Sequence, residues 1–406
     1  MRNKPRIRFK GFTEDWEQRK LGDIATITGG GTPSTNISEY WNGDIDWYSP
    51  VEIGEKRYAS GSIRKITKLG LEKSSAKILP VGTVLFTSRA GIGNTAILQV
   101  EGCTNQGFQS ITPNSKELDT YFLYTMTPKL KRYGEVTGAG STFVEVSGKQ
   151  MEQMNLMIPS LDEQKHVSQL FKVMDDAITL HQRKLEKLKL AKKALLQKLF
   201  PKNGSQFPEI RFKGFTDAWE QRKLGDIATF SKGNGYSKSD LASSGAPIIL
   251  YGRLYTNYET TISNVNTFVE LKDKSVISQG GEVIVPASGE TAEDISRASV
   301  VKKQGIIIGG DLNVIKANHL LDPTFLALTI SNGEQQKELS KRAQGKSVVH
   351  LHNSDLQEVN LTFPLLNEQK EISTLFEKMD NIITLHQCKL DKLQDVKKGL
   401  LQKMFV

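Results

Sequence analysis

The residues of this chain that are best suited to chemistry lie in loops rich in polar side chains. Examples are Ser88–Thr95 (SRAGIGNT), Cys103–Ser110 (CTNQGFQS) and Pro286–Arg297 (PASGETAEDISR). Arg, Asn, Gln, Ser and Thr form hydrogen bonds with base edges and phosphates in DNA complexes. The candidate DNA-contacting residues are Arg89, Asn94, Asn105, Gln106, Ser141, Arg253, Ser288, Glu290, Asn313 and Lys346. For any one of them, an ordinary surface loop is the simpler interpretation.

Motifs for catalysis and metal binding do not emerge from the sequence. Ser340–Ser347 resembles a phosphate-binding loop, but it has serine at the first glycine position and follows a charged, helix-like segment. The sequence lacks an Asn-Pro-Pro-Tyr stretch, an HExxH motif and a CxxC pair, and its glycines do not fit a dinucleotide-binding fingerprint. His350 and His352 have no cluster of acidic residues or cysteines nearby. We therefore expect no catalytic residue, no metal and no cofactor on this chain.

Composition favours a globular protein with an anionic partner. The chain has 406 residues, enough for two or three domains, and a formal net charge of +9. This charge favours nucleic acid, although an ordinary basic protein remains an alternative. The sequence contains neither a long apolar run nor the apolar core of a signal peptide, and Cys103 and Cys388 are expected to be unpaired thiols. These features predict a cytoplasmic location without a membrane span.

Two long helices must position the loops. In Gln164–Phe200 the apolar residues recur at alternating steps of three and four, the heptad pattern of a helix packed along one stripe. Gln369–Phe405 repeats this pattern with 23 of 37 aligned positions identical, and Lys192 and Lys397 occupy the same polar slot in the stripe. We expect the two helices to pack on each other. The predicted seam residues are Phe171, Met174, Ile178, His181, Leu185, Leu188, Phe376, Met379, Ile383, His386, Leu390 and Leu393.

Many lysines on these helices leave two interpretations open. With Arg183, they are Lys184, Lys187, Lys189, Lys192, Lys193 and Lys198 in the first helix, and Lys389, Lys392, Lys397, Lys398 and Lys403 in the second. Such charges usually form a solvated helix face, but they could also contact phosphates or a protein partner. The sequence does not separate these possibilities.

The helices belong to a tandem repeat of the whole chain. Pro5–Thr26 and Pro208–Thr229 differ at three of 22 positions, and each opens one copy of the repeat. Between each lead-in segment and its helix lies an insert, about Thr28–Ile158 in the first copy and Ser231–Phe363 in the second. The inserts differ in sequence over most of their length but hardly differ in length. A conserved frame with divergent inserts is typical of a scaffold holding two modules of one fold with different surfaces.

The chain resembles the specificity subunit of type I restriction–modification systems. The resemblance covers nearly the whole chain. It rests on WEQRKLGDIA in both copies, on Pro159–Lys165 and Pro364–Lys370 at the helix starts, and on GGTPST, YWNGDIDWYSP and TSRAGIGNTAI in the first insert. It implies an α+β architecture: two mixed α/β target-recognition domains and two long antiparallel coiled-coil helices in a pseudo-two-fold tandem repeat. The implied boundaries are 1–158 and 204–363 for the recognition domains with their lead-in segments, and 159–203 and 364–406 for the spacer helices.

The resemblance also implies a function and a set of partners. Each insert would read one half-site of a bipartite double-stranded DNA target, and the helix pair would fix the unread spacer. Two modification subunits would supply adenine methylation with S-adenosylmethionine, and restriction subunits would supply ATP- and Mg-dependent translocation and cleavage. The alternatives are a single-chain DNA methyltransferase or nuclease, which the missing motifs disfavour, and a protein-only coiled-coil scaffold.

Overall fold

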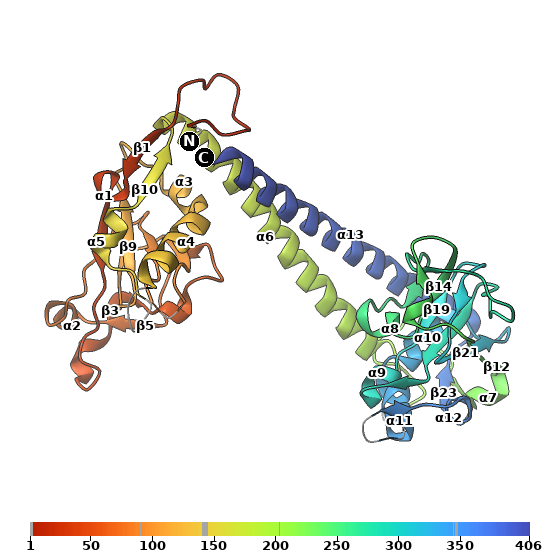
Figure 1. The fold of residues 1–406 in the computed structure, drawn as a ribbon. Helices are drawn as coiled ribbons and strands as arrows, with labels where there is room; N and C mark the ends of the chain where they lie inside the picture. The colour runs from red at the N-terminus through yellow and green to blue at the C-terminus, as the bar shows by residue number, and fades with distance from the viewer. Residues whose placement is uncertain (1–2, 90, 140–144, 203, 344, 346–347) are drawn as a thin grey trace. The chain divides into compact units, whose positions relative to one another are not determined.

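Figure 1 shows the computed structural model of the chain, which describes residues 3–89, 91–139, 145–202, 204–343, 345 and 348–406. The chain divides into two compact units, one containing Met1–His181 with Lys389–Val406 and the other containing Gln182–Cys388. Helices α6 (Leu161–Lys198) and α13 (Leu366–Met404) are long enough for each to contribute one end to each unit. No helix among the described residues is both long and apolar enough to cross a membrane.

The first unit is built on a five-stranded sheet with the strand order β2-β9-β6-β7-β4. A three-stranded sheet, β5-β3-β8, lies in the same insert, and β1 pairs with β10 where the chain enters and leaves it. Strand β6 is buried at every position because its residues are Val84, Leu85 and Phe86. The strands are β1 (Glu17–Lys20), β2 (Ala25–Gly29), β3 (Trp41–Tyr48), β4 (Tyr58–Ala59), β5 (Arg64–Ile66), β6 (Val84–Phe86), β7 (Thr95–Leu98), β8 (Gly102–Thr104), β9 (Gln109–Pro113) and β10 (Asn155–Ile158).

The helices of the first insert cover the sheet and begin at polar caps. Asp119 caps α3 by accepting a hydrogen bond from the Phe122 N–H, and Ser147 caps α5 with a capping box. Trp16, Phe122 and Leu123 belong to the buried core beneath them. The short helices are α1 (Leu21–Ile24), α2 (Lys68–Glu72), α3 (Thr120–Thr125), α4 (Thr127–Gly138) and α5 (Gly148–Glu152), with 3-10 turns η1 (Ser38–Tyr40) and η2 (Pro50–Glu52).

The second unit repeats this architecture from a different sequence. Its five-stranded sheet has the order β12-β21-β17-β19-β15, and its second sheet has the order β13-β16-β14-β20. The strands are β11 (Glu220–Lys223), β12 (Ala228–Lys232), β13 (Leu241–Ala242), β14 (Ala246–Ile249), β15 (Thr261–Ile262), β16 (Phe268–Val269), β17 (Glu282–Pro286), β18 (Ser288–Gly289), β19 (Ser299–Val301), β20 (Ile307–Ile308), β21 (Leu312–Ala317), β22 (Val349–His350) and β23 (Asn360–Phe363). The helices are α7 (Leu224–Ile227), α8 (Arg253–Thr256), α9 (Ala292–Ile295), α10 (Pro323–Ile330), α11 (Gly333–Arg342) and α12 (Asn353–Gln357), with the 3-10 turn η3 (Lys238–Asp240).

The two large sheets correspond strand by strand. In each, the edge strand pairs in parallel with its neighbour, β4 with β7 in the first unit and β15 with β19 in the second. The remaining pairs are antiparallel, and β1–β10 has its counterpart in β11–β23. The two divergent inserts therefore share one strand topology. The sequence pattern of a repeated frame around two modules of one fold predicted this result.

The long helices pack on each other, as the matching stripes predict, and they run antiparallel, as the family resemblance implies. In the first unit the start of α6 packs with the end of α13, where Phe171 shares a core with Met404. In the second unit the end of α6 packs with the start of α13, where Leu199 shares a core with Phe376. Both helices begin three residues earlier than the stripe indicates, at Leu161 and Leu366. The predicted mixed α/β modules with two long antiparallel helices are therefore observed.

Candidate nucleic-acid interface

One ion pair, which occurs in both copies of the repeat, joins the lead-in segment to its long helix. In the first unit the Arg8 guanidinium donates two hydrogen bonds of 2.7 Å to the Glu163 carboxylate, which is 1% exposed. In the second unit Arg211 and Glu368 form the same bidentate pair, also with two bonds of 2.7 Å and a carboxylate that is 1% exposed. Each pair ties a lead-in segment to the first turn of a long helix.

A second repeated contact joins each long helix to a cap inside the insert. The Gln164 side chain accepts a hydrogen bond of 2.9 Å from the Asp119 N–H, and its amide donates to the Glu117 and Pro159 carbonyls. Gln369 makes the equivalent bonds to the Asp322 N–H and to two carbonyls. Gln164 and Gln369 are fully buried, so these contacts fix where the short helices α3 and α10 start relative to the long ones.

The helices also meet through an ion pair at the polar slot of the stripe. In the first unit Lys397 lies 2.5 Å from Asp175, and in the second unit Lys192 lies 2.5 Å from Asp380. All four side chains are partly buried. These two lysines are therefore part of the packing between helices rather than part of a solvated face.

The predicted seam residues are all at least partly buried. Phe171, Met174, Leu185, Phe376, Met379 and Leu390 are buried, and Ile178, His181, Leu188, Ile383, His386 and Leu393 have intermediate exposure. Leu180 and Leu385, by contrast, are 51% and 54% exposed.

Three candidate residues of the first insert gather at one end of its large sheet. Backbone hydrogen bonds join Gly31 to Thr104 and Ser88 to Gly107, which brings the loops after β2, β6 and β8 together. Arg89 lies across from Glu145 in an isolated β-bridge, with 3.8 Å between the charged groups and with both side chains more than one third exposed. Asn105 lies in the adjoining loop, where its side chain accepts a bond of 2.8 Å from the Gly107 N–H. The neighbouring Gln106 is exposed and accepts a hydrogen bond from Thr32.

The loops cross so closely that one position requires glycine. A Cβ atom built on Gly30 would lie 1.9 Å from the Asn105 carbonyl oxygen, and one on Gly233 would lie 1.9 Å from the Gly309 carbonyl oxygen in the second insert. No real side chain tolerates such a distance. The crossing of these loops is therefore the same in both inserts.

Matching hydrogen bonds show which residues correspond at this sheet end. Ser88 N–H donates to the Gly107 carbonyl at 2.8 Å in the first insert, and Ala287 N–H donates to the Asp311 carbonyl at 2.8 Å in the second. The next residues are Arg89 and Ser288, each paired across a β-bridge or short ladder, with Glu145 and His350 respectively. An arginine beside a carboxylate in one insert is thus replaced by a serine beside a histidine in the other.

The remaining candidates lie elsewhere or are enclosed. Asn94 lines a cavity of about 300 Å³ beside Asp175 and Lys397. Arg253 donates to Glu259 at 2.6 Å and is 14% exposed, and Asn313 is fully buried with its amide donating to the Leu351 carbonyl. Glu290 is exposed beyond β18. Ser141 and Lys346 lie outside the described residues.

The described residues contain no cluster of three His, Cys, Asp or Glu side chains able to hold a metal ion. His350 and His352 stack with nearly parallel rings 6.4 Å apart, as expected for alternate residues on one side of an extended segment. Cys103 is buried and Cys388 exposed, and neither is in a disulfide, as predicted. Burial raises the pKa of the Cys103 thiol to about 12, which makes it unreactive.

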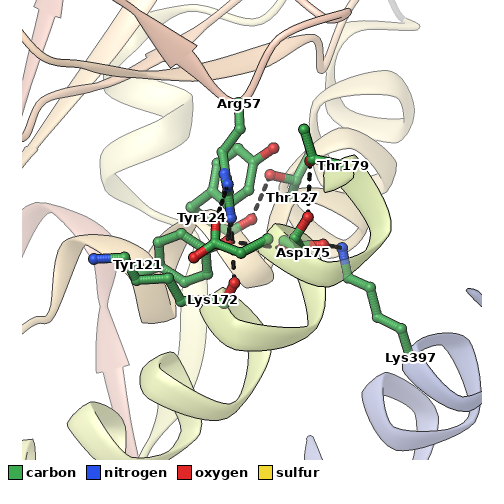
Figure 2. A network of polar contacts seen from close by, with 9 residues as sticks. Arg57, Tyr121, Tyr124, Thr127, Lys172, Asp175, Thr179 and Lys397 are labelled. Carbon is green, nitrogen blue, oxygen red and sulfur yellow. Dashed lines mark hydrogen bonds and ion pairs between the residues drawn. The ribbon is translucent and has the colours of Figure 1, made fainter. Parts of the chain in front are cut away.

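Around α6, the first insert adds a polar network of its own (Figure 2). Arg57 donates to the Tyr121 hydroxyl at 2.7 Å and to Asp176 at 2.5 Å, and Tyr121 donates to Asp175 at 2.7 Å. Burial alone would lower the pKa of Arg57, but these hydrogen bonds raise it above its ordinary value, so the guanidinium stays charged. Burial raises the pKa of the neighbouring Tyr124 to about 12.

Residues 13–190 and 216–395 each match the protein family described as the type I restriction modification DNA specificity domain. The chain belongs to this family. The two matches lie in the two copies of the repeat and together cover most of the sequence. They place the chain among specificity subunits rather than among the catalytic subunits of restriction–modification systems, as the resemblance in sequence implied.

Relatives agree with this assignment, and a solved structure has a similar fold. The type I restriction enzyme MjaIX specificity subunit of Methanocaldococcus jannaschii is 28% identical over 411 residues, which span 96% of this chain and 93% of the relative. The EcoR124I/EcoR124II specificity subunit of Escherichia coli is 26% identical over 177 residues, 42% of this chain and 43% of the relative. The fold is similar to that of the type I restriction–modification S subunit from M. genitalium, with a TM-score of 0.66, 12% identity and 99% of both chains covered.

The sequence analysis did not predict the ion pairs that join the lead-in segments to the long helices. Arg8 and Glu163 lie in phrases that recur unchanged in the second copy, as Arg211 and Glu368. Their retention in both copies is a weak signal, because exposed charges such as Lys10 and Glu17 are retained as well, as Lys213 and Glu220. Arg57 left no such signal, since the second insert has no equivalent cation.

Proposed function

We propose that this chain recognises a bipartite sequence in double-stranded DNA, with one half-site contacted by each insert. The observation that carries the proposal is the loop crossing at the end of each large sheet. Its backbone hydrogen bonds match in the two inserts, but its partly exposed side chains differ, with Arg89 in one and Ser288 in the other. Different donors and acceptors at equivalent positions select different bases.

In this proposal the loop residues make the base contacts and the basic frame adds attraction to phosphates. Arg89, Asn105 and Gln106 are the strongest candidates in the first insert because the fold brings them together. In the second insert the candidates are Ser288, which is the counterpart of Arg89, and Glu290. Ser141 and Lys346 are further loop candidates. Each bidentate contact to a base would contribute about 1–3 kcal/mol of discrimination. Asn94, Arg253 and Asn313 would act indirectly, through the shape of the loops.

The proposed partners follow from the family. The specificity chain would assemble with two modification subunits, which methylate adenine, and with restriction subunits, which translocate and cleave DNA in the cytoplasm. The proposed division is 1–158 and 204–363 for the recognition domains, with 159–203 and 364–406 as spacer helices that set the distance between half-sites.

The direct test is an exchange of one insert. Residues 28–158 are replaced by the corresponding insert of another specificity chain, and the variant is expressed with the modification subunits in a host that lacks other adenine methylation. Genome-wide mapping of methylated adenines should show one half-site replaced and the other half-site and the spacer unchanged. Alteration of both half-sites would refute the assignment of one half-site to each insert.

Two further measurements separate the alternatives. A single-chain methyltransferase or nuclease would bind S-adenosylmethionine or cleave DNA when purified alone, whereas we expect neither. A protein-only scaffold would give no sequence-selective DNA binding even with modification subunits present. For the proposed function, selective binding should weaken steeply with salt, because phosphate contacts release counterions.

A further inference from the structure

Contacts between the inserts and the long helices fall into a repeated class and a non-repeated class. The repeated contacts, described above, use Gln164 and Gln369 or Glu163 and Glu368 and have the same geometry in both units. The non-repeated contacts lie about two turns further along each helix, where the frame sequences differ. Lys172 in α6 corresponds to Glu377 in α13, and Asp176 corresponds to Asn381.

In the first unit the non-repeated contact is made by Arg57, which directly precedes strand β4. Its side chain is 15% exposed, and its guanidinium donates to Asp176 at 2.5 Å and to the Lys172 carbonyl at 3.4 Å. The guanidinium carbon also lies 4.8 Å from the centre of the Tyr58 ring. Figure 2 shows Arg57 reaching past Tyr121 of α3 toward α6, where Lys172 and Asp175 lie.

In the second unit a different pair joins the insert to the helix. Lys302 contacts both Glu377 oxygens at 2.9 Å, and the Thr324 hydroxyl donates to Glu377 at 3.0 Å. Glu377 thus accepts hydrogen bonds from two residues of the second insert. At the corresponding position of α6 the first unit has Lys172, which would repel Lys302.

Strand register shows that the two cations come from different places in the shared fold. Ile97 N–H donates to the Arg57 carbonyl in the first insert, and Val300 N–H donates to the Thr260 carbonyl in the second, both at 2.8 Å. Thr260 is therefore the counterpart of Arg57. Beside Thr260 lies a cavity of about 240 Å³, lined also by Glu377, Asp380 and Asn381. The second unit thus has an open space where the first unit has the Arg57 side chain, and an amide where it has the Asp176 carboxylate.

We propose that each insert is matched to its own long helix by these position-specific ion pairs, so that an insert moved to the other position of the chain would lose its pair. The pair of Arg57 and Asp176 holds the first insert on α6. The pair of Lys302 and Glu377 holds the second insert on α13. All four are positioning residues, which hold the inserts on the frame. The inference concerns the chain alone and does not depend on the proposed DNA recognition.

A double-mutant cycle in the natural chain tests the first pair. Arg57→Thr introduces the residue found in the second insert, Asp176→Asn introduces the residue found in α13, and the third variant carries both. Hydrogen exchange of β4 and the middle of α6 is measured by mass spectrometry. We expect Asp176→Asn to speed exchange about two- to fivefold in the natural background, the range of a partly exposed ion pair, and to have no effect in the Arg57→Thr background. An equal effect in both backgrounds would overturn the inference.

A chain carrying the first insert at both positions tests the selection itself. Arg57 of the added copy would then face Asn381. Asn381→Asp should slow exchange in the second unit of this chain by a similar factor, but it should not do so in the natural chain, where Thr260 faces Asn381. Equal responses in the two chains would contradict the proposal. If the duplicated chain does not fold, the cycle in the natural chain still decides whether Arg57 and Asp176 act as a pair.

Discussion

Loss of one frame ion pair should loosen a lead-in segment from its long helix. Arg8→Ala removes the partner of a carboxylate that is 1% exposed and held by two bonds of 2.7 Å. Removing one member of a buried pair costs about 3–5 kcal/mol, because the remaining charge stays buried without a partner. Glu163 lies in the first turn of α6, where the helix dipole offsets about 0.3–1 kcal/mol of that cost. We therefore expect a loss of about 3 kcal/mol.

The assay is native-state hydrogen exchange resolved by segment. A loss of about 3 kcal/mol corresponds to roughly 150-fold faster exchange through opening, since about 1.4 kcal/mol is a factor of ten. The faster exchange should be confined to residues 3–24 and the start of α6. Arg211→Ala should have the same effect on the second unit, which provides an internal replicate. Glu163→Gln should cost less, because it removes the charge that needs compensation.

Arg6→Ala is the matched control, because it removes a guanidinium from an exposed position two residues earlier. Exposed substitutions of this kind usually change stability by less than about 0.5 kcal/mol. If Arg8→Ala and Arg6→Ala gave the same exchange rates, the ion pair would not be what holds the lead-in segment. Loosening of both units by Arg8→Ala would also contradict the reasoning.

Three further results are expected. Arg89→Ala should reduce the discrimination between bases at one position of one half-site by about 1–3 kcal/mol and leave the other half-site intact, as read by mapping methylated adenines. Equal weakening at all sequences would indicate a phosphate contact instead. Phe171→Ala and Phe376→Ala should each cost about 3–5 kcal/mol, and hydrogen exchange should localise the loss to the unit that holds the substituted ring. Burial alone would raise the pKa of Glu282, but the Ser278 hydroxyl and nearby backbone N–H groups lower it below 4.5. Its contribution to the free energy of unfolding should therefore be complete at neutral pH and lost as pH falls through the folded-state pKa, so urea denaturation of Glu282→Gln should show a weaker decline in acid.

Much of the architecture is predictable from the repeat, because the two copies in one chain can be compared with each other. The stripe in Gln164–Phe200 predicts a long packed helix, and its near copy predicts the partner. The polar slot at Lys192 and Lys397 looks like an interruption of the stripe, and only the structure shows that Asp380 and Asp175 neutralise it. The common topology of the inserts is predicted from their nearly equal lengths in a shared frame, not from their own residues.

The candidate site is less predictable, because loop composition does not reveal which polar side chains are enclosed. Asn313 has the same chemistry as Asn105, but it lies in strand β21 and uses its amide inside the core. Arg253 looks like a base-reading arginine, but Glu259 holds it at 2.6 Å. Arg89 and Gln106 lie close together because a backbone hydrogen bond joins the neighbouring residues Ser88 and Gly107. No local sequence pattern predicts this contact between two loops.

Gly30 and Gly233 limit how such proteins can be engineered. A designer who randomises the exposed loops to obtain new sequence preferences would have to keep these two glycines, since the strand termini that carry the loops come within contact distance there. Diversity can be introduced on either side of each glycine but not at it. A library built on this rule should retain folded members at a far higher frequency than one that randomises the whole loop.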